Sequence, residues 1–296
     1  MNHRLVPITT ALLGLVIAAF STQASLAQPT HGVSIAFNYT DFTSWSVYGS
    51  ASAANSTSGN GFSYSVLALT QPGSNSSIGA AFAPAPIALN LDEAFSFDFY
   101  FYIVGDALRG DGLSFTLARE PGSGGAGSAL GYEGIDHSVA LAFDTFNFDD
   151  EPASPSLQLL QNGSTQPLAV TETGLGDDIR NSWAQSLVTL SFSPSGMGDA
   201  TGTLSGSFLY YTMPDDPFSY TVYTVSATID LSSLLAEGQN PQDALLYYGF
   251  TAANGAASDG HFIASAAPVP EPGAGLMLLA GLASLGLLTA RRRPQA

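Results

Sequence analysis

The residues best suited to chemistry in this sequence are carboxylates near the middle of the chain. Asp144 is followed within seven positions by Asp149, Asp150 and Glu151. Oxygen-rich loops suit hard cations such as calcium, so residues 144–151 could hold a calcium ion. A run of acids is also typical of a solvated loop, and both interpretations stay open.

The sequence offers little else that could catalyse a reaction. It contains no cysteine, so it has no thiolate nucleophile and no disulfide. Retaining glycosidases need two carboxyl groups about 5 Å apart, and on a sheet these usually alternate along one strand. Ala142 stands two positions before Asp144, so that pair is not formed. With no Ser-His-Asp arrangement and no histidine metal motif, we predict that the protein is not an enzyme.

The body of the chain is strongly acidic. The 296 residues include 24 acidic and 7 basic side chains, for a net charge of −17. Four of the seven arginines, but only one acid, Glu271, lie in the two terminal segments described below. The remaining surface repels phosphate backbones, which excludes nucleic acid as a partner. It would attract divalent cations and keep the protein soluble.

The first 27 residues have the three parts of a secretory signal. Arg4 gives a positive start, residues 5–20 are apolar, and Ser25-Leu26-Ala27 is a small-residue cleavage site before Gln28. The apolar run is short for a membrane span. We therefore predict that residues 1–27 are a cleaved signal peptide and that the protein is exported.

Residues 268–296 combine a short motif, an apolar stretch and a basic end. A Pro-Glu-Pro triplet precedes an apolar run at residues 273–290, which is long enough to cross a bilayer as a helix, and three arginines follow it. This order resembles the PEP-CTERM sorting signal of Gram-negative bacteria. The resemblance implies transient anchoring in the inner membrane, removal of the tail by an exosortase-type membrane protease, and delivery to the cell surface or extracellular matrix. The signal residues are Pro270, Glu271, Pro272, Arg291, Arg292 and Arg293.

Between the two ends, residues 28–267 alternate strand patterns with turn signals. Apolar residues occupy every second position from 95 to 103 and from 188 to 192, the period of a half-buried strand. Residues 221–229 are rich in β-branched and aromatic side chains. Only residues 231–237 look helical. Many short strands without helical partners predict one all-β domain, a β-sandwich or jelly roll.

Four blocks of this body resemble those of L-type (legume-like) lectins, in the order of that family. They are residues 67–70 with 79–82, residues 110–117 (GDGLSFTL), residues 130–135 with 139–146 (LGYEGI and VALAFDTF), and residues 248–255 (YGFTAANG). The resemblance implies a concanavalin-like jelly-roll β-sandwich that binds carbohydrate.

The resemblance also implies a sugar site. In that family a sugar is held by an aspartate that follows a cis peptide bond, a backbone N–H of a Gly-rich loop, an asparagine and an aromatic ring. Here Asp111 matches the aspartate, so the Gly110–Asp111 bond is expected to be cis, and Phe146 matches the ring. Asp111 could instead cap a turn, and Phe146 could be ordinary packing. The expected carbohydrate-binding residues are Asp111, Gly127, Ser128, Phe146, Asn147, Ser258 and Asp259.

The family's metal site is only partly preserved. A calcium and a transition-metal ion order the sugar loops of these lectins, and Asp144 matches the carboxylate that bridges them. Ala142 replaces a glutamate ligand and Ser156 a histidine ligand, so we expect no transition metal. Calcium could still bind in an altered geometry. The residues expected at that metal site are Asp144, Phe146, Asn147 and Glu151.

Together these features predict an exported carbohydrate-binding protein of the cell surface or matrix, with a polysaccharide or glycan as partner. The incomplete metal site favours one alternative. In that alternative, the chain is a structural β-sandwich of the matrix or biofilm that has lost sugar binding.

Overall fold

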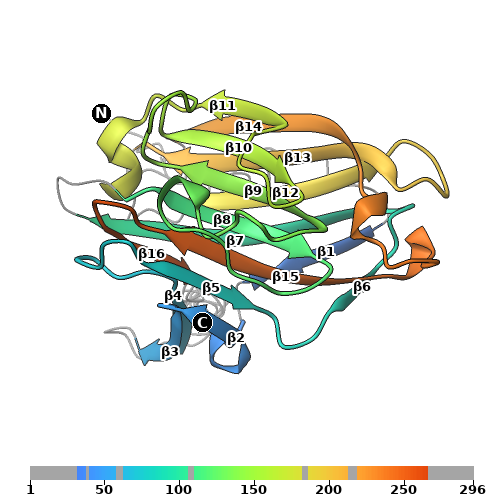
Figure 1. Cartoon of the computed structure of the whole chain (residues 1–296), viewed down its shortest axis with the longest axis horizontal. Helices are drawn as coiled ribbons and strands as arrows, with labels where there is room; N and C mark the ends of the chain where they lie inside the picture. Colours follow the sequence, from blue (N-terminus) through green and yellow to red (C-terminus); the bar gives the residue numbers. More distant parts are fainter. Residues whose placement is uncertain are drawn as a thin grey trace, which may run out of the picture. The chain divides into compact units, whose positions relative to one another are not determined.

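Period-two alternation of large apolar and small polar residues builds two stacked sheets (Figure 1). The computed structural model describes residues 32–37, 40–57, 63–105, 110–181, 186–212 and 219–265. All of these lie in one compact unit that begins at Gly32. The predicted signal peptide (1–27) and the predicted sorting tail (268–296) with its span (273–290) lie outside the described residues. Within the described part of the chain, no helix is long and apolar enough to cross a membrane.

The first sheet has the strand order β14-β13-β12-β7-β16-β4-β3, and β1 pairs in parallel with β7. Its other pairs are antiparallel. The three strands predicted from periodicity and composition lie in β7, β12 and β14. The strands are β1 (Gly32–Ala36), β3 (Ser52–Thr57), β4 (Ser63–Ala68), β7 (Ala94–Gly105), β12 (Ser186–Pro194), β13 (Thr201–Tyr211), β14 (Tyr220–Asp230) and β16 (Asp259–Ala264).

The second sheet is antiparallel, with the order β11-β10-β9-β8-β15-β5-β2 and β6 on β15. Its strands are β2 (Ser46–Gly49), β5 (Ile78–Phe82), β6 (Ile87–Leu89), β8 (Gly112–Ala118), β9 (Ser138–Asp144), β10 (Ser156–Gln161), β11 (Ala169–Glu172) and β15 (Ala244–Ala253). The predicted all-β sandwich is therefore confirmed.

The described helices are short 3-10 turns in the connections. The helical stretch predicted at residues 231–237 contains one such turn, η5. The turns are η2 (Phe42–Ser44), η3 (Gly127–Ala129), η4 (Gly176–Asn181), η5 (Ser232–Leu234) and η6 (Pro241–Asp243).

Aromatic side chains fill the space between the two sheets. The ring of Phe97 on β7 lies 5.1 Å from that of Phe115 on β8, and Phe101 on β7 lies 4.5 Å from Phe143 on β9. All four side chains are buried. Burial of each contributes roughly 1.5–3 kcal/mol, and the contacts cross from one sheet to the other. The core thus fixes how β8 and β9 sit on β7.

A long loop covers the outer face of the second sheet. Leu130 and Tyr132 pack there against Ala140 and Ala142 of β9, so β8 and β9 are buried along their whole length. The hydroxyl of Thr251 on β15 donates a hydrogen bond to the Leu130 carbonyl at 2.8 Å. This cover holds η3 and its glycines close to one edge of the sheet.

Candidate functional site

Three loops meet at one edge of the second sheet because β8 pairs with β9 on one side and with β15 on the other. Gly112 lies opposite Asp144 on β9 and opposite Ala253 on β15. The loop before β8, the loop after β9 and the loop after β15 are therefore neighbours. The Thr145 N–H donates to the Asp111 carbonyl at 2.8 Å. The loop that carries Asp111 and the loop that follows Asp144 are therefore in direct contact.

Asp111 lies at the centre of these loops. Its Oδ2 accepts a hydrogen bond from the Gly255 N–H at 2.5 Å. A Cβ built on Gly127 would lie 3.7 Å from both Asp111 Oδ1 and Gly255 Cα, so two glycine backbones flank the carboxylate. Burial raises the pKa of Asp111, with smaller contributions from the charges of Glu151 and Asp259, while the Gly255 hydrogen bond lowers it. The arrangement leaves a carboxylate acceptor beside backbone with no side chains in the way.

The peptide bond before Asp111 differs from the expectation. The Ser154–Pro155 bond is the one cis peptide of the described segments, so the Gly110–Asp111 bond is trans and the cis prediction is wrong. A non-proline cis bond costs about 2.5–4 kcal/mol. In the trans form Gly110 already donates its N–H to Asp259 Oδ2 at 2.9 Å and accepts from the Thr145 hydroxyl at 2.9 Å. Nothing in the surroundings requires the costlier isomer.

The remaining expected sugar-binding residues lie on the connecting loops. Phe146 is 37% exposed and lies two residues after the end of β9. Ser128 is half-buried within η3, two residues before Leu130. Ser258, also half-buried, accepts a hydrogen bond from the Gly73 N–H at 2.8 Å, which fastens the β15–β16 loop to its neighbour.

The Asp144 carboxylate accepts hydrogen bonds from three groups of the protein. Its Oδ1 accepts from the Phe146 N–H at 3.1 Å and from the Ser154 hydroxyl at 2.9 Å, and its Oδ2 accepts from the Gln158 amide at 3.1 Å. The same Gln158 amide donates to Ser156 Oγ at 2.9 Å. Burial raises the pKa of Asp144 to about 6. The Gln158 amide thus lies beside Asp144, the residue that matches the metal-bridging carboxylate of L-type lectins.

The loop after Asp144 is closed on itself. The Asn147 amide donates to the carbonyls of Glu151 and Pro152, at 2.7 and 2.9 Å, and Glu151 Oε2 accepts the Phe148 N–H at 2.9 Å. In the part of the chain that the structure describes, no group of three acidic, histidine or cysteine side chains could hold a metal. Asp144 accepts hydrogen bonds from three protein groups and Glu151 Oε2 accepts one, so a cation that used these oxygens would compete with protein donors.

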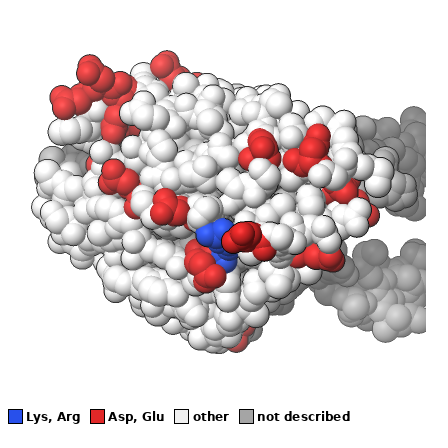
Figure 2. Space-filling view, turned by 45° about the vertical axis from the view of Figure 1, so that its right-hand side comes forward, with Lys and Arg blue, Asp and Glu red and all other residues white. Residues whose placement is uncertain are grey.

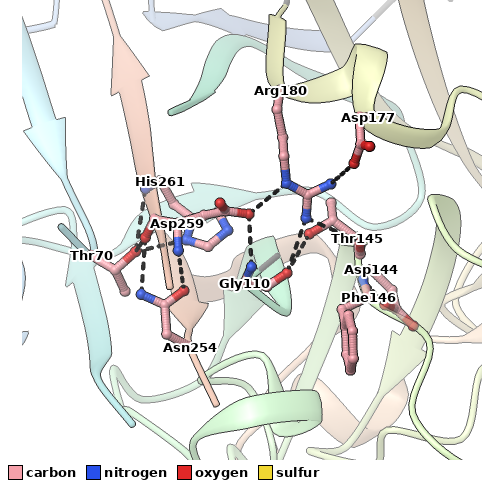
Figure 3. A network of polar contacts seen from close by, with 10 residues as sticks. All are labelled: Thr70, Gly110, Asp144, Thr145, Phe146, Asp177, Arg180, Asn254, Asp259 and His261. Carbon is pink, nitrogen blue, oxygen red and sulfur yellow. Dashed lines mark hydrogen bonds and ion pairs between the residues drawn. The ribbon is translucent and has the colours of Figure 1, made fainter. Parts of the chain in front are cut away.

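Asp259 does not lie at the surface, so its assignment to sugar contact is wrong. It is completely buried, and its Oδ2 accepts from Arg180 Nε at 2.8 Å and from the Gly110 N–H at 2.9 Å (Figure 3). Its backbone N–H and carbonyl pair with the Asn254 side chain, at 3.0 and 2.9 Å. The carboxylate is therefore part of an internal network behind Asp111.

His261 belongs to the same network. It is fully buried, and its Nδ1 lies 2.7 Å from the Thr70 hydroxyl. Burial, with the charge of Arg180, lowers the pKa of His261 to about 3, so the ring stays neutral at ordinary pH. The imidazole is thus a neutral, buried part of the network.

Sequence reasoning missed two residues of this region, Arg180 and Gln158. Arg180 carries one of the few positive charges in a body without lysine, and that scarcity was a usable signal. Gln158 is a polar residue between Leu157 and Leu159 and lies directly opposite Ala142. A long polar side chain in an otherwise apolar strand was therefore a second usable signal. It lies opposite Ala142, which replaces the glutamate expected from the family.

The described surface is predominantly acidic. Figure 2 shows acidic side chains scattered over one face with little basic surface among them. Arg119 and Arg180 are the arginines among the described residues, and Arg180 is buried. Such a surface repels phosphate backbones.

Two parts of the chain match models of known protein families. Residues 34–163 match the family model of the legume lectin domain, and residues 268–293 match that of the PEP-CTERM protein-sorting motif. The first match contains Asp111, Gly127, Asp144 and Phe146. Both resemblances predicted from the sequence are therefore confirmed. The search of curated protein sequences found no match.

Solved lectin structures share the fold. A lectin from Bauhinia forficata in complex with GalNAc has a TM-score of 0.52 at 21% identity, covering 77% of this chain and 93% of that lectin. Winged bean acidic lectin complexed with methyl-α-D-galactose gives 0.50 at 20%, covering 74% and 95%. The Ca²⁺-bound exoplasmic/lumenal domain of VIP36 gives 0.50 at 18%, covering 77% and 87%. At these identities the likeness shows the fold: a legume-lectin jelly roll.

Proposed function

We propose that the protein is an exported carbohydrate-binding protein and that its sugar site is centred on Asp111. The observation that carries this proposal is the position of the Asp111 carboxylate. It is held by the Gly255 N–H and faces the Gly127 backbone, where three loops of a lectin fold converge. Phe146 lies on the loop after β9 with part of its side chain exposed.

The chemistry of this arrangement suits a sugar. An ionised carboxylate accepts hydrogen bonds from hydroxyl groups and makes them stronger than neutral pairs. An exposed aromatic ring can cover the apolar C–H face of a sugar. Ser128, Asn147 and Ser258 add polar groups around the same loops. Asp259 has no part in sugar contact.

We propose no catalytic role for the site. Asp144, on the neighbouring loop, accepts hydrogen bonds from three protein donors, which do not direct it toward a bond to be cleaved. Release of reducing sugar from a bound polysaccharide would contradict this.

Calcium enters the proposal as a condition to be tested. An ion at Asp144 would compete with the hydrogen bonds from the Gln158 amide and the Ser154 hydroxyl. The same contacts support a second candidate, a structural matrix sandwich without sugar binding, since protein groups already hold this carboxylate in place.

The two ends complete the proposal. Residues 1–27 act as a cleaved signal peptide, residues 28–267 are the lectin-like domain, and residues 268–296 are a sorting tail that crosses the inner membrane at 273–290. The match to the PEP-CTERM motif at residues 268–293 supports cleavage of the tail by an exosortase-type protease and delivery to the cell surface or matrix.

A glycan array separates the two candidates. The purified full-length chain is applied to glycans ending in galactose, N-acetylgalactosamine or mannose, and to bacterial polysaccharides, with calcium and with EDTA. We expect retention of at least one glycan class by the wild type and loss of that retention in Asp111→Asn. Absence of retained glycan in both conditions would favour the structural candidate.

A further inference from the structure

One buried guanidinium connects all three loops of the candidate site. Arg180, on η4, donates from Nε to Asp259 Oδ2 at 2.8 Å and from Nη2 to the carbonyls of Gly110 and Thr145, both at 3.2 Å (Figure 3). Its Nη1 lies 3.8 Å from Asp177 Oδ1. The Arg180 side chain is 5% exposed and that of Asp259 is fully buried.

Each acceptor lies next to a residue of the site. Gly110 precedes Asp111, Thr145 precedes Phe146, and Asp259 ends the loop that begins after β15 and includes Gly255. The acceptors are also tied to one another, since Gly110 donates to Asp259 and accepts from Thr145. A guanidinium is a rigid planar fork, so it sets the relative positions of its acceptors.

A buried ion pair is a poor way to gain stability alone. Removing two charges from water is costly, and apolar residues of similar volume often stabilise a core better. What the Arg180–Asp259 pair provides is fixed geometry among loops that have little regular structure. In L-type lectins that task belongs to metal ions, and here the carboxylate matching their bridging ligand, Asp144, is filled by protein donors.

We propose that Arg180 is the positioning residue of the sugar site, holding the Asp111, Phe146 and Gly255 loops in binding geometry without a divalent cation. This inference rests on the proposed function for its binding readout. Its loop-ordering part can be tested without any sugar.

Two variants of the full-length chain test it. Arg180→Lys keeps a positive charge beside Asp259 but cannot reach all three acceptors. Arg180→Met combined with Asp259→Asn removes both charges together, so no unpaired charge stays buried and the fold is preserved. The matched control is Arg119→Met, which removes a half-buried arginine that donates to the Leu235 carbonyl at 3.2 Å, away from the site.

Two measurements are made with calcium and with EDTA. The first is binding to the array of galactose, N-acetylgalactosamine and mannose glycans. The second is hydrogen exchange at the amides of Gly110, Thr145 and Gly255, compared with amides of β13 and β14. We expect both Arg180 variants to weaken binding by about tenfold or more, because a preorganised site is lost. Exchange should accelerate at the three loop amides only, and EDTA and the Arg119 control should change neither readout.

The outcomes are distinguishable. EDTA that abolishes glycan binding or loop protection in the wild type overturns the inference, as does unchanged loop exchange in both Arg180 variants. A wild-type chain that binds no glycan overturns the proposed sugar site, and with it the binding part of the inference. Loop protection that depends on Arg180 would then still establish the loop-ordering part.

Discussion

Replacing Asp144 by asparagine should stabilise the protein at neutral and alkaline pH. The carboxylate is 6% exposed and accepts only from neutral groups, namely the Phe146 N–H, the Ser154 hydroxyl and the Gln158 amide. An asparagine can accept from the first two through its oxygen. Its own N–H₂ can then donate to Gln158 if that amide turns over, so the network survives without a buried charge.

The size of the effect follows from the pKa. Burial raises the pKa of Asp144 from 3.8 to about 6, which corresponds to about 3 kcal/mol at about 1.4 kcal/mol per pKa unit. The folded state binds this proton more tightly than the unfolded state does. The stabilising contribution is therefore complete below pH 3.8 and is lost as the pH rises past about 6. Asp144→Asn should match the wild type near pH 4 and exceed its free energy of unfolding by about 3 kcal/mol near pH 8.

Urea unfolding at the two pH values, followed by fluorescence of the buried Trp45, measures the difference. Asp150→Asn is the matched control, because it removes the same charge from an exposed position in the neighbouring loop. The reasoning is refuted if Asp144→Asn is less stable than the wild type at pH 8. A loss that appears only when calcium is added would show that the carboxylate serves a cation.

Four further predictions concern binding and sorting. Asp111→Asn keeps an acceptor for its backbone partner but loses the charge, so glycan affinity should fall about tenfold or more without a loss of thermal stability. Because burial raises the pKa of Asp111, wild-type binding, titrated by calorimetry, should be lost on acidification at a pH above the ordinary aspartate value of 3.8. Phe146→Ala should weaken glycan affinity about fivefold to tenfold, because one aromatic contact is lost. Phe148→Ala, at a more exposed ring, should change glycan affinity little. Equal losses of affinity in the two variants would argue against stacking on Phe146. Replacing residues 270–272 by alanine should leave the tail uncleaved and the chain in the membrane fraction. Immunoblotting and mass spectrometry measure both. A variant with the same mature mass as the wild type would contradict exosortase processing at this motif.

The fold could be predicted because its main signals are local. The alternation along β7 places Phe97, Phe99 and Phe101 on one face, and that face is the one that packs on the second sheet. The turn residues between strands limit each strand's length. Which strands would become neighbours came from the family resemblance, since nothing local indicates that β15 inserts between β8 and β5.

The site was predicted less completely because its geometry depends on contacts between distant residues. Asp111 was assigned from its place in a matching block, and Gly127 from its place in the Gly-rich loop that the resemblance implies. The burial of Asp259 was not, since it depends on Arg180, which is 79 residues away in sequence. A resemblance carries a residue's position in a loop, but not whether that residue faces the solvent or the interior.

The changes around Asp144 form one connected set rather than separate losses. Ala142 lies opposite Gln158, and Ser156 lies opposite Asp144, so the two replaced metal ligands of the family flank the amide that now reaches the carboxylate. A glutamate at position 142 would place a second carboxylate in the space that Gln158 uses, and a cation or a proton would then have to neutralise part of the charge. With alanine there, the neutral Gln158 amide donates to Asp144 instead. If Arg180 orders the loops around Asp111 as proposed, losing the guanidinium should disorder the surroundings of Asp111.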